Sequence, residues 1–131
     1  MPVLKSGILN PQVNSLLSRV RHTNTLIVAD RGFPFWPEIE TIDLSLVDDI
    51  PRVLDVLYAI QTNFAVGRFF MAEEFRLHNA PEIVHQFADA MASVDVTYEP
   101  HEDLKKRVPH AIGLIRTGDT MEFANVILES A

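Results

Sequence analysis

The chain has 131 residues, the length of one domain, and it can bury a core without help from a disulfide or a structural metal. It contains no cysteine, which excludes a disulfide framework and a thiol nucleophile and suits a reducing cytoplasm. Its formal net charge of −7 repels phosphate backbones, and it shows neither a signal-peptide pattern nor an apolar run of about 20 residues, so we expect a cytoplasmic protein that binds neither nucleic acid nor membrane.

A capping residue and a proline begin the first predicted helix. Asn10 offers a side-chain oxygen to the free N–H groups of the first turn, and Pro11 has no N–H to leave unpaired. Apolar residues follow at helical spacing, which predicts an amphipathic helix over residues 11–20. The next apolar run, residues 25–29, is short and apolar throughout, which is typical of a strand buried on both faces.

The rest of the chain alternates between short apolar runs and helical patterns. Further strands are predicted at residues 39–44, 66–71, 94–98, 111–115 and 126–128. Further helices are predicted from Asp48-Asp49 and Pro51 onward, with Val53, Leu54, Leu57 and Ile60 inward; from Asn79 and Pro81 to residue 92; and from Pro100-His101 to Pro109.

This alternation predicts an α/β fold. We expect a single domain over residues 1–131, with a mostly parallel sheet and helices on both faces. The last two strands flank the turn signal Gly118-Asp119, so they are also compatible with a hairpin and an antiparallel edge strand.

Two polar residues that flank the predicted strand of residues 25–29 are candidate catalytic or ligand-binding residues. Asp30 follows the strand of residues 25–29, and ligands in open α/β sheets bind beyond the carboxyl ends of strands. Asp30 is equally compatible with a loop-bracing or capping role, and less so with a phosphoacceptor. His22 follows the first helix, where it either caps the helix or acts as a general acid or base.

The other polar candidates have weaker patterns. His101 precedes two acidic residues that are typical of a helix start, whereas His78 is expected in a solvated loop and His85 at the surface. Asn125 either braces a turn or hydrogen-bonds a polyhydroxy ligand.

Several cofactor motifs are absent from the sequence. It has no HExxH metal motif, no glycine-rich phosphate loop of the GxGxxG or GxxxxGK[ST] type, and no GxSxG nucleophile elbow. We therefore expect neither a metal nor a cofactor.

The segment ADRGFPFWP, residues 29–37, places three aromatic rings and two prolines directly after Asp30. Gly32 lets the backbone approach a ligand, and the prolines stiffen the loop. The rings can pack on their own core, cover the apolar face of a ligand, or contact another subunit, and we favour a subunit contact for at least one of them.

Six pieces of the sequence, in this order, resemble the ribose/fucose mutarotase family, which comprises the D-ribose pyranases and L-fucose mutarotases. They are Lys5-x-Gly7-Ile8-Leu9-Asn10, His22-Thr23, Ala29-Asp30-x-Gly32-x-Pro34, Ile42-Asp43-Leu44-Ser45-Leu46, Arg116-Thr117-Gly118 and Ala124-Asn125. The resemblance implies an α/β subunit that assembles into rings, often decamers, with the active site at a subunit interface. It also implies interconversion of the anomers and ring forms of a free monosaccharide without cofactor or metal.

The resemblance also implies roles for individual residues. The family's proton donor falls on His22 and its strand-end aspartate on Asp30. Its sugar-binding positions fall on His101 and on the segment Phe123-Ala124-Asn125, and Lys105 and Arg116 lie near its pocket. The family usually has tyrosine at position 123, where this chain has a phenyl ring that cannot hydrogen-bond a hydroxyl. Glu73, Glu74 and Arg76, expected in a loop after the third strand, have no assigned role.

Two functions follow from these expectations. The first is a mutarotase in which an acid and a base open the sugar ring, with Asp30 contacting the sugar or orienting His22. The second, motivated by Phe123, is a sugar-binding or regulatory protein on the same scaffold that has lost turnover. A purely structural ring-forming protein is a third class.

Overall fold

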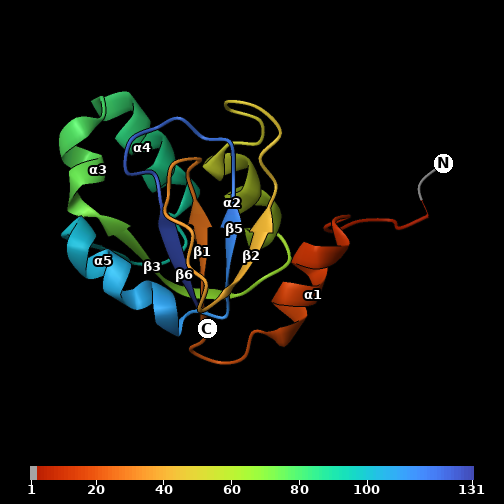
Figure 1. Cartoon of the computed structure of the whole chain (residues 1–131). Helices are drawn as coiled ribbons and strands as arrows, with labels where there is room; N and C mark the ends of the chain where they lie inside the picture. Colours follow the sequence, from red (N-terminus) through yellow and green to blue (C-terminus); the bar gives the residue numbers. More distant parts are fainter. Residues whose placement is uncertain (1–2) are drawn as a thin grey trace.

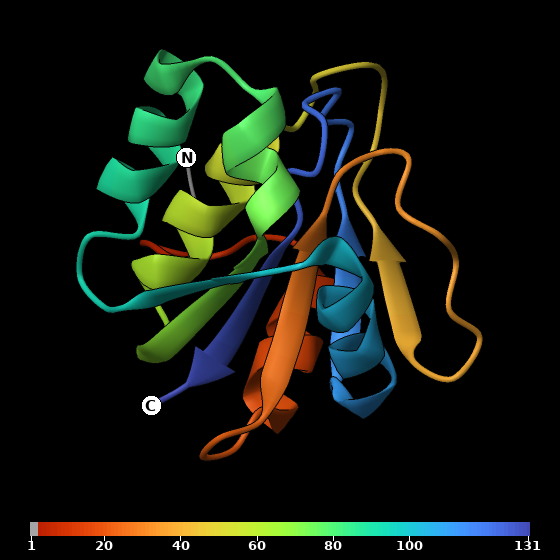
Figure 2. The same cartoon turned by 90° about the vertical axis from the view of Figure 1, so that its left-hand side faces the viewer.

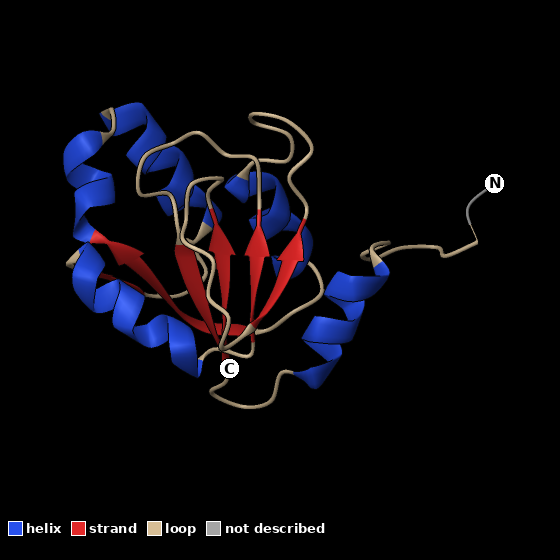
Figure 3. Cartoon of the chain, in the orientation of Figure 1, coloured by secondary structure: helices blue, strands red, loops and turns tan. Residues whose placement is uncertain are grey.

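The computed structural model describes residues 3–131, which form one six-stranded sheet with helices on both faces (Figure 1 and Figure 3). The strand order is β2-β5-β1-β6-β3-β4. The strands are β1 (Thr25–Ala29), β2 (Glu40–Asp43), β3 (Val66–Ala72), β4 (Val96–Glu99), β5 (Gly113–Arg116) and β6 (Val126–Ser130). The helices are α1 (Pro11–Arg19), α2 (Val53–Gln61), α3 (Glu73–His78), α4 (Pro81–Ala90), α5 (His101–Arg107) and the 3-10 turn η1 (Val108–His110).

The α/β prediction is confirmed, but the antiparallel strand lies elsewhere than expected. Strand β5 pairs in parallel with β1 and β2, and β3 pairs in parallel with β4. Strand β6 is antiparallel to both β1 and β3 and lies between them in the sheet. The hairpin of β5 and β6, which the sequence left open as an alternative, therefore does not form. Both strands are largely buried and apolar, so both find places in the sheet interior on either side of β1.

Two hydrophobic clusters separate the layers of the molecule. Buried side chains of α1, α2 and α4 pack on one face of the sheet with Phe75 of α3. The other face is covered by α5, η1 and part of the loop that follows β1, through Leu104, Val108 and Phe33 (Figure 2). No helix within residues 3–131 has the length and apolar character needed to cross a membrane.

Local signals account for most element boundaries. The side chain of Asn10 accepts a hydrogen bond from the Val13 N–H and begins α1 as predicted. Helix α2 begins only at Val53, after Arg52, because the segment before it forms turns against Gly118. A β-carbon at Gly118 would lie 2.3 Å from the Val47 carbonyl oxygen, so this close approach requires glycine.

The segment predicted as a loop after β3 is the short helix α3. Asn79, expected to cap the next helix, instead donates from its side chain to the carbonyl oxygens of Phe75 and Glu122, at 3.0 and 2.9 Å. Helix α4 starts after Ala80, without a side-chain cap. Asn79 therefore ties α3 to the loop of residues 117–125, which joins β5 to β6.

Candidate functional site

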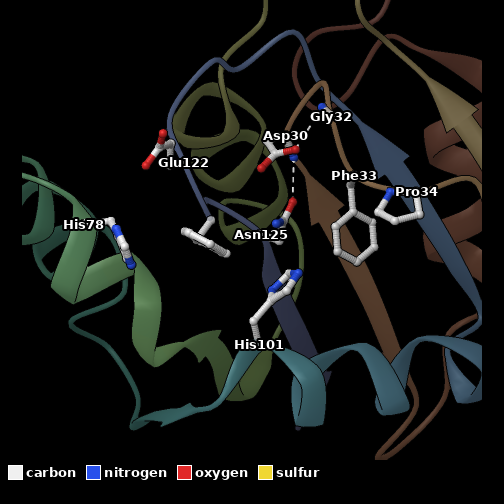
Figure 4. A pocket seen from close by; sticks show the side chains of 9 residues that line it. Asp30, Gly32, Phe33, Pro34, His78, His101, Glu122 and Asn125 are labelled. Atoms are coloured by element: carbon white, nitrogen blue, oxygen red, sulfur yellow. Dashed lines mark hydrogen bonds between the residues drawn. The ribbon is translucent and has the colours of Figure 1, made fainter.

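The carboxyl ends of β1, β3 and β4 and the amino end of β6 meet at one edge of the sheet, where they surround a pocket of about 530 Å³. Its lining is Asp30, Gly32, Phe33, Pro34, His78, His101, Glu122, Phe123 and Asn125 (Figure 4). A pocket beyond the carboxyl ends of strands is where an α/β sheet binds small ligands.

Asp30 and Asn125 are held together in the centre of this edge. Asp30 directly follows β1 and Asn125 directly precedes β6, and the antiparallel pairing of these strands makes them neighbours. The Asp30 N–H donates to Oδ1 of Asn125 at 2.8 Å, and the Gly32 N–H donates to Oδ1 of Asp30 at 2.9 Å (Figure 4). Burial raises the pKa of the Asp30 carboxyl, although its hydrogen bonds with Gly32 and Asn125 oppose that shift.

His101 is the first residue of α5, and two other elements position it. Its N–H donates to both carboxylate oxygens of Glu74 in α3, at 3.0 and 3.1 Å. Its ring packs edge-on against Phe33 and Phe123, with centroid distances of 6.3 and 5.2 Å. Its Nδ1 is buried and makes no hydrogen bond within residues 3–131, which is rare for a buried polar atom.

Phe123 forms the floor between two imidazoles. It adopts a φ of 57°, in the left-handed region that a bulky side chain rarely enters. Its ring lies 5.2 Å from that of His101 and 5.3 Å from that of His78. Backbone strain of this kind, of the order of 1–3 kcal/mol, clusters at ligand sites.

His78 and Glu122 line the pocket but had no functional signal in the sequence. His78 ends α3, which was predicted as a loop, and Glu122 lies in the loop between β5 and β6. Only the folding of α3 beside that loop brings them to the site, and neither position carries a motif.

A buried polar network fixes the 117–125 loop. Asp119 is 3% exposed, and its carboxylate accepts from the Val53 and Met121 N–H groups at 2.9 and 2.8 Å. The Thr117 hydroxyl donates to the Ala29 carbonyl at 2.8 Å. The network therefore connects the start of α2, the end of β1 and the loop that carries the pocket residues.

His22 does not lie in this pocket. It is exposed and precedes β1, where the Thr23 N–H donates to the carbonyl of Ser130 at the far end of β6. Five residues of strand, about 16 Å, separate this edge from Asp30. Within one chain, therefore, His22 and Asp30 lie at opposite ends of β1.

Lys105 and Arg116 also lie outside the pocket. Lys105 forms an ion pair with Glu102 at 3.1 Å and lines a separate hollow of about 420 Å³ beside Trp36. The Arg116 guanidinium donates to the Arg31 carbonyl at 3.1 Å and so braces the loop behind Asp30.

The aromatic loop after Asp30 divides its rings between three environments. Phe33 is 5% exposed, packs on its own core and also lines the pocket. Trp36 is half-buried against the same core, while Phe35 is 70% exposed. Phe33 therefore both packs on its own core and forms part of the pocket wall, and Phe35 packs on neither.

The pocket offers carboxylate, amide and imidazole groups above an aromatic floor. Such groups recognise a small polyhydroxy molecule, because they donate and accept hydrogen bonds while the rings cover C–H surfaces. Within residues 3–131, no three His, Asp or Glu side chains are grouped so that they could hold a metal ion.

Comparison with known proteins finds relatives over nearly the whole chain. Residues 3–131 match the model of the RbsD / FucU transport protein family. A D-ribose pyranase of Geobacillus kaustophilus (strain HTA426) is 40% identical over 126 residues, which cover 96% of this chain and 92% of that protein. A D-ribose pyranase of Staphylococcus aureus (strain USA300 / TCH1516) is 32% identical over 129 residues, covering 96% of each.

Two solved structures have the same fold. Bacillus subtilis RbsD complexed with D-ribose superposes with a TM-score of 0.91 at 29% identity, covering 98% of this chain and 97% of that one. The fucose mutarotase of Streptococcus pneumoniae in complex with L-fucose gives a TM-score of 0.83 at 20% identity, covering 98% of both chains, and shares the fold.

Proposed function

The chain belongs to the RbsD / FucU transport protein family, and we propose that it is a monosaccharide mutarotase that interconverts the ring forms and anomers of a free aldose such as ribose or fucose. The observation that carries the proposal is the pocket around Asp30, His101 and Asn125, in a chain 40% identical to a D-ribose pyranase. The pocket volume, about 530 Å³, lies in the range of small-molecule sites.

The proposed reaction needs two proton movements and no redox step. A base takes the proton of the anomeric hydroxyl while an acid protonates the ring oxygen, and the C1–O bond to the ring oxygen breaks to leave a free aldehyde. The aldehyde rotates and closes again, through the same or another hydroxyl, with the protons moving in reverse. Each well-placed acid or base contributes typically 10²- to 10⁴-fold to the rate, so side chains alone can catalyse the reaction without metal or cofactor.

We assign Asp30 and Asn125 to hydrogen bonds with sugar hydroxyls, and the imidazole of His101, which also lines the pocket, to a further hydrogen bond. The proton donor, His22, is supplied by a second copy of the chain, because its own β1 separates it from its own pocket. The raised pKa of Asp30 supports a direct role, since carboxyls with pKa values perturbed by burial are typical of functional sites.

The same proposal includes a ring-shaped homo-oligomer, a pentamer or decamer. Large apolar side chains are exposed around the amino-terminal segment and the 46–50 turn: Val3, Leu4, Leu9, Leu46, Val47 and Ile50. Exposed apolar groups of this kind mark surfaces that bind other protein chains. Sedimentation velocity measures the assembly directly, and a monomer at micromolar concentration contradicts this part of the proposal.

Anomeric exchange measured by NMR tests the activity. We expect saturation transfer between the anomeric signals of D-ribose to increase when the wild-type protein is added, and to fall to the buffer level with His22→Ala. His85→Ala is the matched control, because His85 is also exposed and forms only a surface pair with Asp89. Exchange at the buffer rate for every common aldose contradicts the proposal.

A second candidate is a non-catalytic sugar-binding or regulatory protein, and Phe123 favours it. The ring of Phe123 has no hydroxyl to hydrogen-bond the sugar or assist a proton transfer. Calorimetry against a monosaccharide panel, together with Phe123→Tyr, separates the two functions. Binding without exchange, with exchange restored by the tyrosine, supports the second candidate, whereas exchange by the wild type excludes it.

A further inference from the structure

We infer that His78 is a specificity-determining residue that hydrogen-bonds a hydroxyl of the bound sugar on the side of the pocket away from Phe33 and Pro34. The inference deepens the proposed function and rests on it. His78 faces the cavity from the end of α3, across from Phe33 and Pro34 (Figure 4). The polar groups already proposed as sugar ligands, Asp30 and Asn125, line the pocket after β1 and before β6.

His78 is held at the pocket by its own helix. Phe75, three residues earlier, is fully buried and anchors α3 in the core. Asn79, the next residue, donates to the Phe75 and Glu122 carbonyls and so fixes the end of the helix to the 117–125 loop. Although the His78 side chain is exposed, its backbone is thus tied on both sides, and its position relative to Phe123 is set by the fold.

The imidazole supplies the hydrogen-bonding group that the neighbouring floor lacks. The rings of His78 and Phe123 lie 5.3 Å apart at a tilt of 39°. Phe123 can cover a C–H face of the sugar but offers no polar atom, whereas a neutral imidazole has one donor and one acceptor. A hydroxyl that projects beyond the Phe123 ring therefore meets His78, and an aldose without that hydroxyl loses the contact.

Glu122 is the only other polar side chain that the pocket presents on this side, among residues 3–131. Its carboxylate accepts hydrogen bonds but has no donor, so it complements the imidazole without replacing it. Together they select a ligand with hydroxyls at that end, such as a free aldose, over one with a methyl group or hydrogen there.

A mutant cycle between protein and sugar tests the inference. His78→Phe keeps an aromatic ring beside Phe123 but removes both nitrogens, and His78→Asn keeps hydrogen-bonding capacity. We expect His78→Phe to raise the KM and the calorimetric Kd for D-ribose roughly 5-fold, the usual effect of one lost hydrogen bond, with a smaller change in kcat. His78→Asn should recover part of the loss, and His85→Phe, on α4, should have no effect.

Monodeoxy derivatives of D-ribose identify the hydroxyl. One of these derivatives lacks the hydroxyl that His78 contacts. The wild type and His78→Phe should bind that derivative with equal Kd values, because the hydrogen bond is absent in both complexes. If His78→Phe leaves every Kd unchanged, or weakens ribose and all its deoxy derivatives by the same factor, the inference is wrong. Should His78→Phe unfold, His78→Ala, which also lacks a hydrogen-bonding side chain, replaces it, and a ribose Kd loss shared by all derivatives contradicts a specific contact.

The wild-type protein separates this test from that of the proposed function. A wild type that binds D-ribose without accelerating anomeric exchange contradicts the mutarotase, while the Kd comparison still decides the role of His78. A wild type that accelerates exchange but is unaffected by His78→Phe contradicts only the role of His78.

Discussion

Asp30 directly follows β1, and its buried environment disfavours the ionised form of its carboxyl. Burial raises its pKa, and the nearby Asp119 carboxylate adds a smaller effect in the same direction. Its backbone N–H donates to Asn125, and its carboxylate accepts from Gly32, which fixes the side chain but only partly offsets the burial. A carboxyl kept in an unfavourable environment is typical of a functional site.

The first prediction concerns the charge of Asp30. Because the folded state holds the Asp30 proton more tightly than the unfolded chain, stability falls as the pH rises from the ordinary pKa of 3.8 through the raised folded value, and the loss persists at neutral pH. Asp30→Asn should therefore unfold at higher urea concentration than the wild type at pH 7, with a difference that shrinks as the pH approaches 4. It should also lose anomeric exchange by roughly 10²-fold or more. A variant that is less stable at pH 7 contradicts this account of its environment.

Some of the individual residues of the candidate pocket could be predicted from the sequence. A polar residue after a buried strand identified Asp30 as a candidate without any relative, and Asn125 was a candidate ligand for a polyhydroxy molecule. The resemblance added sugar-binding roles for His101 and Phe123, and all four residues line the same pocket. It also added Lys105 and Arg116, which do not. His78 was missed because an exposed histidine at the end of a short helix has no sequence pattern that separates it from a solvated one.

Helices α3 and α5 act as one support for the pocket wall. Glu74 of α3 caps α5 through the His101 N–H, so the two short helices are joined at a residue that lines the pocket. Glu73, its neighbour, forms an exposed ion pair with Arg76, whose guanidinium lies 3.8 Å from the centroid of the Tyr98 ring. The two adjacent glutamates after β3 therefore have different roles: Glu74 holds the start of α5, whereas Glu73 forms only an exposed ion pair.

The second prediction compares these two glutamates. Glu74→Ala removes a helix cap and should lower the free energy of unfolding by about 1 kcal/mol. It should also raise the Kd for the sugar, because His101 is no longer held. Glu73→Ala breaks only an exposed pair, worth about 0–1 kcal/mol, and should leave the Kd unchanged. Equal sugar affinities of the two variants, measured by calorimetry, would show that Glu74 does not position His101.

The third prediction concerns the buried carboxylate of the 117–125 loop. Asp119→Ala leaves the Val53 and Met121 N–H groups without an acceptor, so the free energy of unfolding should fall by roughly 2–4 kcal/mol. Asp48→Ala is the control, since Asp48 makes an exposed pair with Arg31 and should change stability by less than about 1 kcal/mol. Similar urea midpoints for the two variants would contradict a structural role for Asp119.

The elements themselves were largely predictable, and the failures have a common cause. Helix α1 and strand β1 follow from a cap, a proline and an apolar run, all local signals. Helix α3 was missed because its six residues carry no cap and are stabilised by Phe75 in the core and by Asn79 at the 117–125 loop. The place of β6 between β1 and β3 depends on contacts between distant segments, which strand periodicity does not encode.

For the whole molecule, the direction of β1 determines how a complete site can form. His22 lies before this strand and Asp30 after it, so one chain presents the imidazole at one edge of the sheet and the pocket at the other. Symmetric assembly can join such surfaces, because a head-to-tail contact brings one edge of a subunit to the opposite edge of its neighbour. The proposal therefore predicts that the protein is active only as an oligomer.

Activity of mixed oligomers tests this claim most directly. Co-expressed His22→Ala and Asp30→Asn chains with different affinity tags can be purified as mixed assemblies, and their anomeric exchange with D-ribose measured by NMR. We predict that each variant alone is inactive, and that random mixing restores about one quarter of the wild-type sites, where a native His22 meets a native Asp30 of a neighbour. Wild type co-assembled with the double variant provides the control for active mixed oligomers. Mixed assemblies as inactive as the two single variants, beside an active control, would contradict a site shared between subunits.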